Sequence, residues 1–73
     1  MSDTERLRKA IDDCCRVQRY SYTQLAAASG VGYQTIYKFQ KGYRDSMTLK
    51  NVGKLAKVFG YDTATLLAGR VKS

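Results

Sequence analysis

Two short helical patterns, separated by a turn that contains glycine, constrain the fold of this chain most strongly. The segment "YTQLAAAS" consists of strong helix formers, and "YQTIYKFQ" places Ile36 and Phe39 on one helical face. Two helices that meet at a sharp angle need a small side chain where their backbones approach and a glycine where φ is positive. Ala26 and Gly30 meet these needs. The sequence therefore predicts a helix-turn-helix arrangement over residues 22–40.

Three further helical patterns flank this pair. Residues 4–18 and "LKNVGKLAKVF" carry apolar residues at spacings of three and four, and "TATLLAG" forms a short final helix. The expected inward residues are Leu7, Ala10, Ile11, Cys14, Val17, Leu49, Val52, Leu55, Ala56 and Phe59. The expected N-caps are Asp3 or Thr4, Ser21, Thr48 and Asp62, and the expected C-terminal stops are Gly30, Gly42 and Gly60. Because no useful stretch alternates with period two, we predict an all-α fold of five helices without a sheet.

The length and charge of the chain restrict its class. A chain of 73 residues suits one small domain, 1–73, with a short basic tail at 69–73. It has no apolar run long enough for a membrane span and no signal segment, so we expect a cytoplasmic location. The net charge is +7, and no acidic residue lies between Asp13 and Asp45. The cations in this interval are Arg16, Arg19, Lys38, Lys41 and Arg44. Such a distribution favours a polyanionic partner, although a merely solvated basic face is the simpler alternative.

Catalytic and metal sites are not indicated. Adjacent Cys14 and Cys15 cannot form a disulfide within a helix, so we expect free thiols, with Cys14 in the core and Cys15 partly exposed. The chain has no histidine, and two cysteines cannot supply four zinc ligands. Asp12 and Asp13 point to different sides of a helix and do not form a catalytic pair. We therefore expect no metal, no cofactor and no enzymatic activity.

The third predicted helix has an outward face that can read DNA. Once its apolar residues pack inward, Tyr33, Gln34, Tyr37 and Lys38 point outward, beside Lys41. Glutamine can bond adenine with two hydrogen bonds in the major groove, and a tyrosine ring can pack on a thymine methyl group. Lys50, Lys54 and Lys57, on the outer side of the fourth helix, are expected to be solvated.

With these segments in order, the chain resembles the Cro/cI-type helix-turn-helix family of phage repressors and related regulators. The resemblance extends from about Leu7 to Leu67 and rests on "TQLAAASGV", "TIYKFQKG", "LKNVGKLAKVFGY" and the closing "LL". It implies a compact, five-helix, lambda-repressor-like domain whose third helix is the recognition helix, and a double-stranded DNA operator bound by a dimer.

The resemblance also implies roles for individual residues. Contacts with base edges or the groove are expected from Gly32, Tyr33, Gln34, Tyr37 and Lys38. Contacts with or near phosphates are expected from Tyr22, Lys41, Tyr43 and Arg44, that of Tyr22 through either its phenol hydroxyl or a backbone amide. The chain departs from the family pattern at four positions. Tyr22 replaces a typical glutamine, Gly32 a small polar cap, Cys15 a frequent arginine and Met47 a frequent proline.

The sequence thus predicts a transcription regulator, a repressor or Cro-like protein of a phage or bacterium, with no evident small-molecule ligand. We expect a homodimer on DNA, because a short recognition helix covers few base pairs, with Leu66, Leu67 and Val71 at its interface. The main alternative is an antitoxin-like or adaptor module that binds a protein through the same helices, with its tyrosines as interface anchors. Binding of RNA or of a membrane surface would explain the positive charge, but it would explain poorly the turn geometry between the two short helices.

Overall fold

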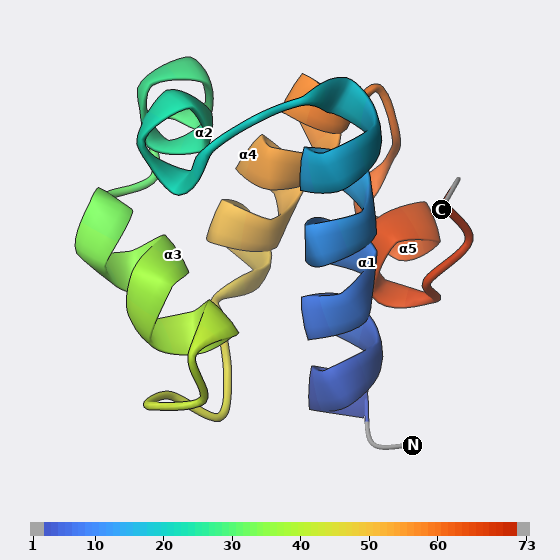
Figure 1. Cartoon of the computed structure of the whole chain (residues 1–73). Coiled ribbons are helices and arrows are strands. Elements are labelled where there is room, and N and C mark those ends of the chain that lie inside the picture. The colour runs from blue at the N-terminus through green and yellow to red at the C-terminus, as the bar shows by residue number, and fades with distance from the viewer. Residues whose placement is uncertain (1–2, 72–73) are drawn as a thin grey trace.

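The structure, a computed structural model, describes residues 3–71 and contains five helices and no strand within them (Figure 1). The helices are α1 (Asp3–Gln18), α2 (Tyr22–Ser29), α3 (Tyr33–Gln40), α4 (Leu49–Phe59) and α5 (Thr63–Leu67). The predicted all-α class is confirmed. The predicted basic tail is described only as far as Val71, and Lys72 and Ser73 lie outside the described residues.

Local hydrogen bonds set most helix boundaries as predicted. Ser21 and Gln24 form a reciprocal capping box, in which the Gln24 amide donates to Ser21 Oγ at 3.1 Å and the Ser21 amide donates to Gln24 Oε1 at 2.9 Å. Thr48 and Asp62 each accept from the amide three residues later, at 3.3 and 2.7 Å. Gly60 ends α4 in the left-handed conformation.

The start of α1 differs from the prediction. Asp3 and Thr4 are both helical residues of α1, so neither is the N-cap that the sequence suggested. Asp3 and Glu5 instead place negative charge in the first turn, where the helix dipole favours it.

One apolar core joins all five helices. In Figure 1, α4 lies centrally, with α2 and α3 on one side and α1 and α5 on the other. The largest completely buried side chains are Phe39, Ile11, Leu25, Ile36, Leu55, Leu66, Val52 and Cys14. Gly53 permits the close approach of α5 to α4, since a Cβ atom there would lie 3.1 Å from Thr63 Oγ1. None of the helices between residues 3 and 71 has the length and apolar character that crossing a membrane requires.

The burial that helical spacing predicts is wrong for three side chains. Val17 and Leu49, predicted to face inward, are 46% and 67% exposed, whereas Cys15, predicted to be partly exposed, is only 7% exposed. At the end of α1 the Tyr20 amide donates to the Cys15 carbonyl oxygen at 2.9 Å, and Tyr20 and Tyr22 pack against the core that includes Cys15. Leu49 is the first residue of α4 and lies at the edge of the packed helices.

Cys14 and Cys15 carry free thiols, as predicted, and both are buried. Burial, together with the neighbouring Asp13 carboxylate, raises the pKa of the Cys14 thiol to about 11. Burial and the Asp12 carboxylate raise the pKa of the Cys15 thiol to about 11 as well. Among residues 3–71, no group of three or more cysteine and carboxylate side chains is placed to hold a metal ion.

Candidate DNA-binding surface

The turn between α2 and α3 adopts the predicted geometry. Gly30 has φ 79°, in the left-handed region, and its amide donates to the Ala26 carbonyl oxygen at 3.0 Å. Ser29 Oγ donates to the Leu25 carbonyl oxygen at 2.7 Å and accepts from the Val31 amide at 3.1 Å. Ala26 is partly buried against the core, and Val31 is buried within it. The turn is therefore fixed by both hydrogen bonds and apolar packing.

The helix α3 has one buried face and one open face. Ile36 and Phe39 are 0% and 1% exposed and hold the helix in the core. The residues predicted to contact bases lie on the other side, where Gly32, Tyr33, Gln34 and Lys38 are exposed and Tyr37 is half-buried. Gly32 precedes the helix with φ −60° and provides no side-chain cap.

Three tyrosine rings form a row along the open side of α3, which we call the aromatic row: Tyr33, Tyr37 and Tyr43. The rings of Tyr33 and Tyr37 are nearly parallel, with centroids 5.9 Å apart, and those of Tyr37 and Tyr43 are 6.4 Å apart. Lys41 Nζ lies 5.9 Å from the centroid of the Tyr37 ring. The sequence identified each tyrosine but gave no indication that the three rings touch.

The segment after α3 is tied to the end of the helix and to α1. The amides of Tyr43 and Arg44 both donate to the Lys38 carbonyl oxygen, at 2.8 and 3.3 Å. Arg8 of α1 reaches across, with Nε donating to the Phe39 carbonyl oxygen at 2.7 Å and Nη2 to that of Arg44 at 2.6 Å. These bonds fix the residues predicted to lie near phosphates.

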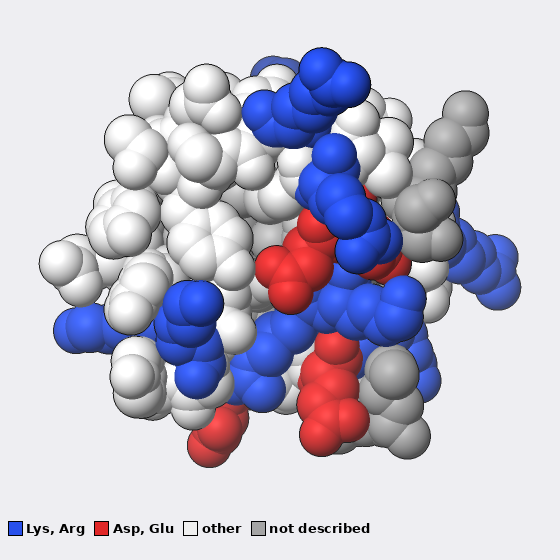
Figure 2. Space-filling view, in the orientation of Figure 1, with Lys and Arg blue, Asp and Glu red and all other residues white. Residues whose placement is uncertain are grey.

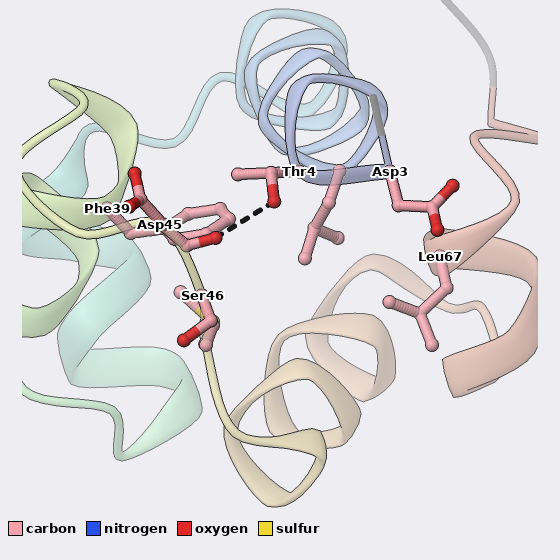
Figure 3. Close-up of a pocket in the computed structure, with 8 residues that line it drawn as sticks. Asp3, Thr4, Phe39, Asp45, Ser46 and Leu67 are labelled. Carbon is pink, nitrogen blue, oxygen red and sulfur yellow. Dashed lines mark hydrogen bonds between the residues drawn. The ribbon is translucent and has the colours of Figure 1, made fainter. Parts of the chain in front are cut away.

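Sequence reasoning did not identify Arg8, because its partners lie 31 and 36 positions along the chain and leave no local signal. The N-terminal turn of α1 adds a further bond, in which Thr4 Oγ1 donates to the Asp45 carbonyl oxygen at 2.8 Å (Figure 3). The end of α3 and the segment after it are thus held by polar contacts with α1.

Tyr22, at the start of α2, lies beside a carboxylate. Its hydroxyl donates to Asp12 Oδ1 at 3.3 Å, and Gln40 Nε2 donates to the same oxygen at 3.0 Å and to the Arg8 carbonyl oxygen at 3.0 Å. Partial burial, reinforced by the Asp12 charge, raises the pKa of the Tyr22 phenol. The Tyr22 hydroxyl, one of the two groups expected to supply a phosphate contact there, is therefore already bonded to a negatively charged group.

Positive charge is concentrated around α1 and near the end of α3. Figure 2 shows lysine and arginine atoms gathered there on the visible face, while the surface over α2 is free of charged atoms. This agrees with the sequence of α2, which contains no charged residue. Part of the positive charge is balanced locally, since buried Asp13 accepts from Lys9 at 3.1 Å and from Arg16 at 2.6 Å. Lys38, Lys41 and Arg44 are exposed.

A shallow apolar hollow lies away from α3's open side, between the start of α1, the segment before α4, and α5 (Figure 3). Its walls include Leu7, Phe39, Met47 and Leu67. An adjoining hollow, bordered by Ala64 and Ala68, shares Leu67 with it. Leu67 and Val71 are half-buried, but Leu66 is 0% exposed and cannot contribute to an interface. The predicted role of Leu66 in dimerisation is therefore wrong.

Two short helices joined at a left-handed glycine, the second with one face in the core and the other open, define a DNA-binding helix-turn-helix domain. The helix-turn-helix family model matches residues 15–66, and the chain belongs to this Cro/cI-type family. No curated protein and no solved structure matches the chain significantly.

Proposed function

We propose that this protein is a sequence-specific transcription regulator, a repressor or Cro-like protein of a phage or bacterium, that reads the major groove of double-stranded DNA with α3. The observation that carries the proposal is the division of α3 into a face buried in the core and an open face with Gln34 and Lys38. A helix anchored in this way can enter the groove while the rest of the domain rests on the backbone. Such a regulator acts in the cytoplasm, where its operator is.

The base-reading set comprises Gly32, Tyr33, Gln34, Tyr37 and Lys38, as predicted from the sequence. Gln34 can form two hydrogen bonds with adenine, and Gly32 allows the start of the helix to approach the base edges closely. Lys38 lies in the last turn of α3 and can bond a base or a neighbouring phosphate.

The phosphate set comprises Lys41, Tyr43, Arg44 and Tyr22. The first three follow α3 in a segment held by hydrogen bonds to Lys38, which limits the ordering required on binding. For Tyr22 we propose a contact through the backbone amide at the start of α2, because its hydroxyl is engaged by Asp12.

We propose a homodimer as the DNA-bound form, since an eight-residue helix reads only a short half-site and two half-sites about 34 Å apart supply the specificity. We propose that its interface lies on α5 and its C-cap residue Ala68, since Ala64, Leu67 and Ala68 follow one another at spacings of three and four from Ala64. Leu67→Glu is expected to lower operator affinity and sedimentation mass together. Leu49→Glu, which changes an exposed leucine on α4, is the matched control and should alter neither.

The function is tested by selecting bound duplexes from a random DNA library and then comparing two variants on the selected sequence. Lys38→Ala is expected to weaken binding to all sequences and to reduce the salt slope by about 1. Gln34→Ala should instead relax the preference at one base pair, by roughly 1–3 kcal/mol. Selection of no sequence, with equal weak binding to every duplex, would contradict the proposal.

The aromatic row gives some support to a second candidate, a module that binds a protein partner through α3, because tyrosine is enriched in protein interfaces. Salt distinguishes the two. DNA binding falls steeply as salt rises, whereas an interface centred on aromatic rings responds weakly.

A further inference from the structure

The aromatic row offers an apolar surface at the place where α3 would meet a base pair. Tyr33 is 42% exposed and Tyr43 is 72% exposed, and half-buried Tyr37 lies between them. Between Gly32 and Lys38 the open side of the helix carries no charged side chain. Apolar ring surface is stabilised when it is buried against another apolar group. We therefore expect these rings to contact an apolar group on the DNA.

The geometry of the rings determines what they present. The Tyr33 and Tyr37 rings lie within 21° of parallel with their centroids 5.9 Å apart, a stacked arrangement of the kind that aromatic pairs favour. Lys41 lies over the central Tyr37 ring, and the Tyr43 amide donates to the Lys38 carbonyl oxygen at the other end of the row from Tyr33. The rings are thus arranged before DNA arrives, which reduces the ordering cost of binding.

The only apolar group that a base pair exposes in the major groove is the 5-methyl group of thymine. We propose that the Tyr33 and Tyr37 rings of the aromatic row form a specificity-determining surface that selects half-sites containing neighbouring thymines through their 5-methyl groups. This inference rests on the proposed function and adds a chemical preference to it. The contact is apolar, so it depends on the tyrosine rings and not on their hydroxyls.

The experiment measures the affinity of the full chain for its selected duplex and for the same duplex with deoxyuridine in place of thymidine, first at all positions and then singly. Uracil keeps every hydrogen-bonding group of thymine and lacks only the methyl. Each methyl group buried against the row should contribute about fourfold in affinity, the equivalent of one buried methylene. The affinity loss should be confined to the thymines that face the row.

Three variants separate the ring contact from other causes. Tyr33→Phe with Tyr37→Phe retains the rings and should keep the thymine-to-uracil ratio. Tyr33→Ala removes an exposed ring and should lower that ratio towards one at its position, and circular dichroism confirms its fold. Gln34→Ala is the matched control on the same helix face, because it should lose base preference but retain the methyl preference.

Each outcome has a distinct meaning. Sequence-specific binding with a ratio of one at every thymine would overturn the methyl preference while the proposed function stands. A ratio that persists unchanged in Tyr33→Ala would also overturn it, because uracil would then act through duplex shape. Absence of any preferred duplex would contradict the proposed function itself.

Discussion

The guanidinium group of Arg8 lies 5.1 Å from the centroid of the Phe39 ring while its Nε donates to the Phe39 carbonyl oxygen at 2.7 Å. One side chain of α1 thus holds both the buried face and an end carbonyl of α3. The last carbonyls of a helix have no partner within it, and a cation there is favoured by the helix dipole. This contact ties the position of α3 to α1.

Replacing Arg8 by Met should lower the free energy of unfolding by about 2 kcal/mol, because two carbonyl oxygens lose a charged donor. Urea denaturation followed by circular dichroism measures the loss. Arg6→Met is the control, since Arg6 bonds only the exposed Asp3 carboxylate among the contacts resolved for it, and such surface pairs contribute at most about 1 kcal/mol. Equal losses in the two variants would show that the bridge to α3 adds no stability.

A side chain at Gly30 should lower the free energy of unfolding by about 1–2 kcal/mol through backbone strain. A Cβ atom there would meet nothing within 4 Å, so the cost of Gly30→Val is conformational and not steric crowding by neighbours. Gly32→Ala is a close control, because Gly32 has φ −60° and an added Cβ would make only an ordinary contact. Thermal melting that gives the wild-type temperature for Gly30→Val would disprove the left-handed requirement.

Arg19, the residue that follows α1, has φ 60°, a conformation that costs a non-glycine residue roughly 1 kcal/mol. Arg19→Gly should therefore raise the free energy of unfolding by about that amount. Arg19→Ala removes the same charge but keeps the strain, so its stability should stay close to that of the wild type. If alanine stabilises the protein as much as glycine, the gain comes from removing charge.

The two buried thiols should react slowly with a thiol reagent in the folded protein. Their pKa of about 11, against an ordinary value of 9.0, leaves about a hundredfold less thiolate at pH 8. Because the folded pKa is raised, the associated stability is complete below pH 9 and is lost as the pH rises through about 11. Labelling that is equally fast with and without urea would contradict the burial of Cys14 and Cys15.

The helices could be predicted from the sequence because their boundaries depend on local chemistry. Ser21, Thr48 and Asp62 cap helices through bonds to amides three residues away, and Gly30 and Gly60 end helices through their own backbone freedom. Such contacts can be recognised within a few positions of the chain.

The features that sequence reasoning missed depend on distant partners. The burial of Cys15 and the exposure of Val17 follow from where the chain turns at the end of α1, which periodicity alone does not fix. Arg8 finds its acceptors more than thirty positions away. The aromatic row depends on Tyr43, whose place beside Tyr37 is set by the loop after α3. The candidate contact residues on α3, by contrast, were identified because one helix face was visibly apolar.

The central claim, that the open face of α3 reads base sequence, is tested most directly by measuring the affinity of the wild-type chain for its selected duplex and for a scrambled duplex across a range of salt concentrations. Both affinities are expected to fall as salt rises, and the selected duplex is expected to bind at least about a thousandfold more tightly at physiological salt. Equal affinities at every salt concentration would contradict the claim, because the basic surface would then hold DNA without reading it.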